Sequence, residues 1–280
     1  MHLLMILGAF GLAWLLRCNW SEPIGNWTQR WQRALLLFLL PPLLLLMTAI
    51  AMLCMGPQGQ MIGLHTDWFS YSLALGYLGL AVIFGLKVAI EGWQSLQQIR
   101  THPEICLNGR TARLLNHSVL FSAQIGFWQP ELVVSQGLLQ TLPAEHLEAV
   151  LTHEQAHYYY RDTFWFFWLG WLRRITAWLP NTDALWQELL VLRELRADRW
   201  AAQRVDALVL AESLLMVVRS PMIVSDSFCA ALSCPVTRDR FQERIDALLG
   251  ESDSPTASNS WTWSWIALAL LPLVAVPFHS

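Results

Sequence analysis

The sequence predicts a mostly helical α+β membrane protein, and three observations support that fold class. Of the 280 residues, 55% are hydrophobic and only 14% are charged, whereas soluble domains average about 25% charged residues. The apolar residues gather in long runs near the two ends of the sequence. Between those runs, from about residue 101 to 249, the composition is that of a globular domain with short strand patterns.

Three apolar segments within residues 1–100 predict three transmembrane helices. The segments are Leu3–Leu16, Ala34–Met55 and Phe69–Ile90. A helix needs about 20 apolar residues to cross a bilayer, so the first segment needs its neighbouring residues to complete a span. The second contains Pro41-Pro42, which a membrane helix tolerates. A fourth apolar run within residues 261–280 predicts one C-terminal transmembrane helix, preceded by a polar, serine-rich linker at 250–260.

Arginines indicate which loops face the cytoplasm, because positively charged loops stay inside. The loop after the first segment carries Arg17, Arg30 and Arg33, and the chain after the third segment carries Arg100, Arg110 and Arg113. The loop at 56–68 contains neither lysine nor arginine. This pattern predicts a multi-pass protein whose N terminus lies outside and whose chain beyond residue 90 lies in the cytoplasm.

The central segment, residues 101–249, predicts a small β-sheet followed by helices. The predicted strands are Ala112–Phe121 and Leu132–Ser135, and the predicted helices are one that begins near Pro143, Leu185–Val205 and Val205–Arg219. Thr163–Pro180 is also apolar but contains Arg173 and Arg174. Each arginine at the centre of a span costs about 2.5–3.5 kcal/mol, so this stretch is predicted to be a buried or membrane-resting helix.

A predicted helix carries the sequence His153-Glu154-Gln155-Ala156-His157. Residues four apart lie on one face of a helix, so both imidazoles can reach a single metal ion while Glu154 projects beside it. This H-E-x-x-H spacing is typical of zinc hydrolases, in which the histidines bind Zn²⁺ and the glutamate is the general base. The alternative is a pair of ordinary polar residues on a helix face. We expect the zinc site, with Glu154 as the catalytic base.

Catalytic zinc takes a third protein ligand and leaves one position open for water. The best candidate is Glu194, within Arg193–Asp198. Asp198 lies four residues later on the same helix face and is predicted to accept a hydrogen bond from a ligand histidine, which fixes the orientation of that ring. The alternative for this stretch is a surface helix of mixed charges. The predicted metal ligands are therefore His153, His157 and Glu194, with Asp198 behind them.

Other polar residues near the motif receive less specific roles. Asp162 either orients the motif helix or forms a cap or salt bridge, and His146 is predicted to be structural. The sequence does not identify the group that stabilises the negatively charged oxygen of a hydrolytic transition state. Its candidates are Tyr158, Arg238 and Arg240.

These segments resemble the metallopeptidase family of the β-lactam sensor-transducers BlaR and MecR, which are membrane Glu-zincins. The matching stretches are 125–134 before the motif helix, 142–154 within it, Arg193–Asp198 at the third ligand, and Arg244-Ile245 with Leu248-Leu249 as a closing motif. The resemblance implies a zincin-like domain with a small β-sheet in residues 101–249, on the cytoplasmic side of a bacterial plasma (inner) membrane. It also implies Zn²⁺ as the cofactor.

One departure limits what the resemblance implies. In BlaR and MecR a penicillin-binding sensor domain follows the last membrane segment, whereas this sequence lacks that domain and has no S-x-x-K acylation motif of that type. The resemblance therefore implies the protease and not antibiotic sensing. The expected partners are the lipid bilayer and a protein or peptide substrate, with a BlaI/MecI-like transcriptional repressor as the implied one. A homodimer stays open.

The leading interpretation is an integral-membrane zinc metalloendopeptidase in regulatory proteolysis. A quality-control protease of the HtpX type is the first alternative, and the arrangement of spans around the motif helix distinguishes it. A non-catalytic membrane scaffold with a zincin fold is the second, although a scaffold has no need of Glu154. A transporter is disfavoured because the predicted spans lack acidic residues apart from Glu91 at an edge. The net charge of −3 gives no case for direct nucleic-acid binding.

Overall fold

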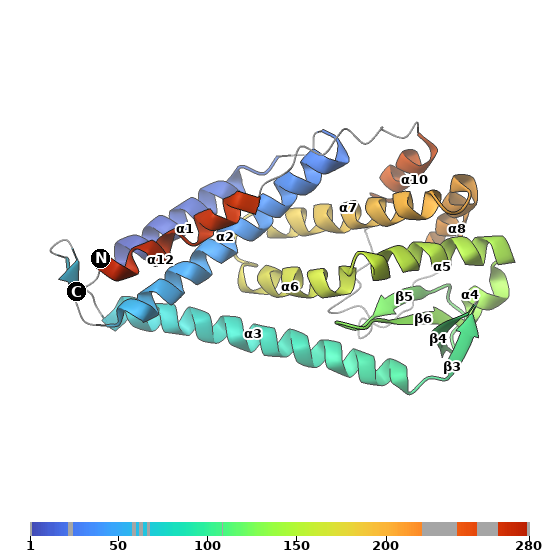
Figure 1. The fold of residues 1–280 in the computed structure, drawn as a ribbon, viewed down its shortest axis with the longest axis horizontal. Coiled ribbons are helices and arrows are strands. Elements are labelled where there is room, and N and C mark those ends of the chain that lie inside the picture. The colour runs from blue at the N-terminus through green and yellow to red at the C-terminus, as the bar shows by residue number, and fades with distance from the viewer. Residues whose placement is uncertain are drawn as a thin grey trace. The chain divides into compact units, whose positions relative to one another are not determined.

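Most of the chain is helical, and one small mixed sheet makes the fold α+β, as predicted (Figure 1). The computed structural model describes residues 2–21, 25–57, 60–61, 64–65, 68–107, 109–219, 240–250 and 263–278. The chain divides into two compact units, which we call the apolar-helix unit and the sheet unit. The first comprises Met1–Leu86, Trp171–Leu189 and Pro255–Ser280, and the second comprises Lys87–Gly170 and Leu190–Ser254.

Two helices are long and apolar enough to cross a membrane, namely α2 (Trp27–Met55) and α3 (Trp68–Arg100). The first predicted span forms α1 (His2–Cys18), an apolar helix of 17 residues that is shorter than a typical span. Between α2 and α3 lies a short hairpin of β1 (Gln60–Met61) and β2 (Leu64–His65). The described part of the C-terminal apolar run forms only short helical turns, which are η2 (Trp263–Trp265), α11 (Ile266–Ala269), α12 (Leu271–Val274) and η3 (Val276–Phe278).

Helix α2 continues through Pro41 and Pro42, and a buried arginine compensates for one of them. Proline has no N–H, so Pro42 cannot bond the carbonyl of Phe38 four residues earlier. Arg17 of α1 instead donates from Nη2 to that carbonyl at 3.3 Å, and its guanidinium carbon lies 5.2 Å from the centroid of the Phe38 ring. Arg17 is therefore buried within α1 and packs on α2, whereas the sequence placed it among the loop arginines.

The sheet unit is built on a four-stranded sheet with the order β3-β4-β6-β5. The strands are β3 (Glu104–Leu107), β4 (Arg110–Leu115), β5 (Ser122–Ile125) and β6 (Glu131–Ser135). β4 and β6 are parallel and the other pairs are antiparallel, which leaves β5 as an edge strand. The predicted strand Ala112–Phe121 is wrong beyond Leu115, because residues 116–121 connect β4 to a strand on the other side of β6.

The motif helix is α5 (Ala144–Tyr159), and it is packed on two sides. Val150 and Leu151 are buried against the sheet together with residues of β6. On another side, Ala156 and Ala197 are both fully buried in one cluster. Ala156 of α5 thus shares a buried cluster with Ala197 of α7 (Thr182–Ala202). Polar residues of α5 and α7 also contact each other, as in the pair of His153 and Glu194.

The remaining described helices are α4 (Gln136–Thr141), α6 (Asp162–Ile175), α8 (Ala207–Arg219) and α10 (Phe241–Leu249). The predicted helices Leu185–Val205 and Val205–Arg219 correspond to α7 and α8, with bounds shifted by a few residues. Helix α6 has one buried side that includes Phe166 and Leu169, and one exposed side that includes Trp165. Of the predicted linker at 250–260, residues 251–260 lie outside the described part of the chain.

Candidate metal centre

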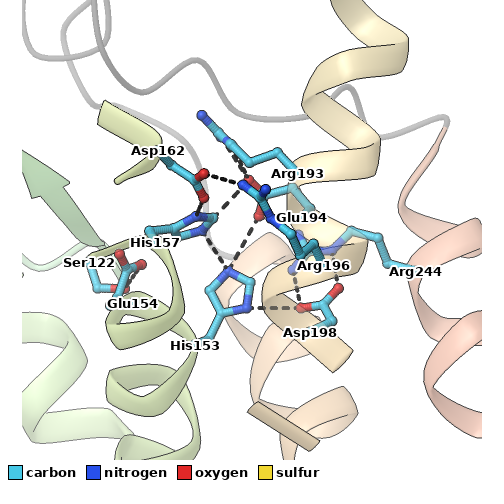
Figure 2. Close-up of polar contacts among 10 residues, drawn as sticks. All are labelled: Ser122, His153, Glu154, His157, Asp162, Arg193, Glu194, Arg196, Asp198 and Arg244. Carbon is cyan, nitrogen blue, oxygen red and sulfur yellow. Dashed lines mark hydrogen bonds and ion pairs between the residues drawn. The ribbon is translucent and has the colours of Figure 1, made fainter. Parts of the chain in front are cut away.

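Two imidazoles of α5 converge on one carboxylate of α7 (Figure 2). His153 and His157 are one helical turn apart, and their ring centroids are 4.8 Å apart. Glu194 lies opposite them, and all three side chains are largely buried, with exposed side-chain fractions of 6%, 11% and 9%. The structure therefore brings together the three ligands that the sequence predicts.

The distances among the three donor groups suit a tetrahedral metal. His153 Nε2 lies 3.1 Å from His157 Nε2 and 3.3 Å from Glu194 Oε2, and His157 Nε2 lies 3.7 Å from Glu194 Oε1. With zinc–ligand bonds of about 2.0–2.2 Å, tetrahedral geometry separates donor atoms by about 3.3–3.6 Å. Among the described residues, His153, His157 and Glu194 are the group of metal-binding side chains whose ligand atoms all lie within 4.8 Å of one another. The donor set and its spacing thus fit Zn²⁺.

Asp198 holds the far side of the His153 ring. Its Oδ1 lies 2.9 Å from His153 Nδ1, at ion-pair distance, although the ring is not aligned for an ideal hydrogen bond. Arg244 of α10 in turn donates two hydrogen bonds to Asp198, from Nε at 2.7 Å and from Nη2 at 2.8 Å. We call His153, Asp198 and Arg244 the Asp198 branch. Because Nδ1 faces Asp198, His153 presents Nε2 to the metal position.

Asp162 holds the His157 ring by a hydrogen bond. Asp162 is the first residue of α6, and its Oδ2 accepts a hydrogen bond from His157 Nδ1 at 2.7 Å. Arg196 of α7 donates a short hydrogen bond to the other carboxylate oxygen of Asp162. We call His157, Asp162 and Arg196 the Asp162 branch. Of the roles left open by the sequence, two are present together, because Asp162 contacts His157 of the motif and forms a salt bridge with Arg196.

Arginines also surround the third predicted ligand, Glu194. Arg193 donates to Glu194 Oε1 from Nε at 2.9 Å and from Nη2 at 2.7 Å, and Arg244 Nη1 lies 3.4 Å from Oε2. Burial by itself would raise the pKa of Glu194, but Arg193, His157 and Arg244 outweigh burial and hold that pKa well below its usual range. Glu194 is therefore an ionised carboxylate, which is the form that binds a metal.

The same balance of burial and charge acts on the Asp198 branch. Burial opposes the charge of Asp198, but Arg244 and His153 lower the pKa of Asp198 overall. For His153, burial lowers the pKa, whereas the carboxylates of Asp198 and Glu194 raise it to about 9. The same carboxylates raise the pKa of Arg244, which stays charged. His153 must consequently release a proton when it binds a metal ion.

Glu154 points away from the three donor groups and toward the sheet (Figure 2). Ser122, the first residue of the edge strand β5, donates a hydrogen bond from Oγ to Glu154 Oε1 at 2.9 Å. The side chain is buried, with 7% of the residue exposed. Glu154 is therefore next to the predicted metal ligand His153 in sequence, outside the candidate ligand group, and beside the edge strand β5.

The remaining predicted candidates lie elsewhere or are not described. His146 Nε2 contacts Glu212 Oε2 at 3.3 Å, which is a structural pairing, and Arg240 pairs with Glu243. Tyr158 is 45% exposed and stacks under Arg161. Arg238 lies outside the described residues. The residue that stabilises the transition-state oxygen is therefore still unassigned.

Sequence reasoning missed four side chains that contact the centre. Some of them contact residues that are distant in sequence, and the arginines among them had several acidic residues as possible partners. The four side chains are Ser122, Arg193, Arg196 and Arg244. The three arginines had one signal, because each falls in a stretch that carries the resemblance. Comparison with protein-family models, with curated proteins and with solved structures finds no match to this chain.

Proposed function

We propose that this chain is an integral-membrane zinc metalloendopeptidase. The observation that carries the proposal is the arrangement of side chains on α5. His153 and His157 converge with Glu194, whereas Glu154 lies outside that group. A purely structural zinc site is usually closed by four protein ligands, whereas three ligands leave a position for water and substrate. A buried carboxylate that is not a ligand has the chemistry of a general base.

The residues of the chain divide the peptide hydrolysis among them. Zinc, when bound, supplies a Lewis acid that polarises the scissile carbonyl and makes water more acidic. Glu154 takes a proton from the attacking water while the water oxygen forms a bond to the carbonyl carbon. Glu154 then gives that proton to the amide nitrogen as the C–N bond breaks. His153 and His157 are kept in one orientation by Asp198 and Asp162 throughout.

The edge strand β5 is the proposed seat of the substrate backbone. An extended peptide can add to an open strand edge by main-chain hydrogen bonds. Because Ser122 of β5 contacts Glu154, a peptide along this edge would have its scissile bond close to the base. The resemblance to BlaR and MecR makes a BlaI/MecI-like repressor the proposed substrate, and it makes regulatory proteolysis the proposed role.

The proposed location is a bacterial inner membrane, with the metal centre on the cytoplasmic side. Helices α2 and α3 have the length and composition of spans, which supports a membrane location. The finer arrangement, with three spans before the centre, one after it and an external N terminus, rests on the arginine pattern of the sequence. A reporter fused after Ser280 tests it, since this arrangement requires an external C terminus and an HtpX-type arrangement of spans does not.

The substitution Glu154→Gln tests the proposed chemistry. The amide keeps the size of the side chain but cannot accept the proton, so peptide cleavage should fall by about 10²–10⁴-fold while bound zinc stays at the wild-type level. Glu148→Gln is the matched control, because Glu148 is an exposed glutamate on the same helix. Cleavage of a peptide library by purified full-length chain is the measurement. Undiminished cleavage by Glu154→Gln would sink the assignment.

A further inference from the structure

An exposed group of aromatic side chains lies on the sheet unit, between the sheet and the start of α6. We call Phe127, Trp128, Trp165 and Trp168 the aromatic patch. Their exposed fractions are 37%, 62%, 59% and 42%. All four rings lie near the ring of Phe164, with centroid distances of 5.0, 5.5, 5.2 and 6.4 Å. Large apolar surfaces that stay exposed together in this way mark interaction sites.

The structure holds the loop half of the aromatic patch firmly. The Phe127 ring packs on Phe164 and Phe167 of α6, with centroid distances of 5.0 and 4.8 Å. Arg161 donates from Nη1 to the Trp128 carbonyl at 2.8 Å, and its guanidinium carbon lies 5.6 Å from the centroid of the Trp128 ring. These contacts hold Phe127 and Trp128 in place at the surface.

The turn that starts this loop needs a glycine. Gly126 has a φ of +140°, and a Cβ there would lie 2.9 Å from Pro130 Cα. Arg161, which braces the loop from the other side, also has a positive φ of 56°. A side chain other than glycine is costly in that region. The sequence thus provides a glycine for one of these conformations and accepts an unfavourable one at Arg161.

The composition of the aromatic patch suits a lipid headgroup region. Three of its four members are tryptophans, and tryptophan collects at membrane interfaces because its ring is apolar while its N–H remains polar. Arg161 lies against Trp128, and an arginine can place its stem among apolar groups while its charge reaches lipid phosphates.

Within the apolar-helix unit, the last residues of α6 contact the candidate span α3. Three residues after Trp168 on α6, the Trp171 indole donates from Nε1 to the Ala81 carbonyl of α3 at 2.7 Å. Gly85 of α3 makes room for the same indole, since a Cβ there would lie 3.3 Å from Nε1. Next to these contacts, Leu80, Val82, Ile83 and Leu86 of α3 are 53–61% exposed, as expected of a lipid-facing surface.

We propose that the aromatic patch inserts into the headgroup region of the lipid bilayer. This inference rests on the proposed membrane location and adds a second kind of membrane contact to it. Asp162, which orients His157, is the first residue of the same α6. The lipid contact therefore holds the metal centre next to the membrane surface, where a substrate near the bilayer can reach it.

Spin labels on single cysteines of the full-length chain test the proposal. Trp128→Cys and Trp165→Cys place labels in the aromatic patch, Val82→Cys marks lipid, and Glu148→Cys marks water. The background chain has all five native cysteines replaced by serine and is checked for wild-type zinc content. The chain is reconstituted in vesicles of phosphatidylcholine and phosphatidylglycerol. Collision rates of each label with oxygen, which prefers lipid, and with a water-soluble nickel chelate are then compared.

We expect the oxygen-to-nickel collision ratio at Trp128→Cys and Trp165→Cys to be severalfold higher than at Glu148→Cys and lower than at Val82→Cys. Ratios equal to that at Glu148→Cys, with a high ratio at Val82→Cys, would overturn the patch proposal and leave the membrane location intact. A low ratio at Val82→Cys would contradict the membrane location itself. Labels shielded from both reagents would overturn lipid insertion and show that protein covers the rings.

Discussion

The two histidines of the candidate metal centre are held by matching pairs of residues that the fold assembles in different ways. In the Asp162 branch, the imidazole and its aspartate are only five residues apart, at the corner between α5 and α6. In the Asp198 branch, Asp198 is bound by an arginine 46 residues further along, on α10. One branch is therefore mostly local, and the other forms only when distant helices have packed.

Burial separates the two branches further. The side chains of Asp198 and Arg244 are 2% and 8% exposed, whereas Arg196 in the Asp162 branch is 20% exposed. An unpaired charge in a dry site is costly, while water can partly replace a partner near the surface. Both branches place an aspartate and an arginine behind a histidine, but the Asp198 branch depends more strongly on the packing of distant helices than the Asp162 branch does.

The largest expected effect comes from breaking the Asp198 branch at its arginine. Arg244→Ala removes the guanidinium that donates two hydrogen bonds to the buried Asp198, which should lower the free energy of unfolding by about 3–5 kcal/mol. Arg196→Ala should cost less, because Arg196 is more exposed. Arg240→Ala is the control on the neighbouring turn, and its partly exposed ion pair predicts a loss below about 1 kcal/mol. Urea unfolding of the solubilised full-length chain measures all three losses. Equal losses for Arg244→Ala and Arg196→Ala would contradict the proposed difference between the two branches.

Zinc affinity tests whether both branches orient ligands. Asp198→Asn and Asp162→Asn should each weaken zinc binding by about 10–100-fold, because each removes the carboxylate that fixes an imidazole. The larger loss is expected at Asp198, since its replacement also leaves the Arg244 charge without its main partner. Competition with a zinc chelator measures the affinities. A folded variant with wild-type affinity would remove that branch from the centre.

The acid stability of the chelator-treated chain sharpens the same difference. The pKa of Asp198 is lowered in the folded chain, below the value of about 3.9 in an unfolded chain. Its ionisation therefore contributes stability above about pH 4, and this contribution is lost as the pH falls through the lower folded pKa. The wild-type chain and Arg244→Ala should differ in unfolding free energy at pH 6 and converge below about pH 4. A gap that persists at low pH would show that the ion pair is not its source.

Ser122→Ala should have the smallest effect on the metal, because Ser122 contacts Glu154 and belongs to neither branch. We expect unchanged zinc affinity and a kcat lowered by about tenfold, which is the value of one hydrogen bond to a charged group. Ser122→Thr keeps a hydroxyl that can bond Glu154 and should therefore keep wild-type kcat. Ser118→Ala is the matched control at an exposed serine. A loss of zinc in Ser122→Ala would contradict the separation between base and ligands.

The sequence predicts those parts of the site that a single helix determines. His153 and His157 share a face because they are four residues apart, and the same spacing on α7 places Glu194 and Asp198 together. Ala156 of α5 and Ala197 of α7 lie in one buried cluster, and the sequence does not show that pairing. The grouping was therefore predictable, while the geometry of the group was not.

Contacts between distant elements account for what sequence reasoning missed. Ser122 meets Glu154 only because β5 lies at the edge of the sheet, and strand order is not encoded in local alternation. The predicted strand Ala112–Phe121 ran too far for a related reason, since the apolar residues Val119–Phe121 look like part of the same strand, although they belong to the connection after β4. Arg17 resembles a loop arginine until its bond to the Phe38 carbonyl is seen.

X-ray absorption at the zinc edge of the purified full-length chain tests the central claim most directly. The account predicts one zinc per chain, with two imidazole nitrogens at about 2.0–2.1 Å and carboxylate or water oxygen at about 2.0–2.2 Å. His153→Ala and Glu194→Ala should each remove that signal. A chain purified without zinc after growth in zinc, a zinc site with sulfur ligands, or an unchanged spectrum in both variants would contradict it.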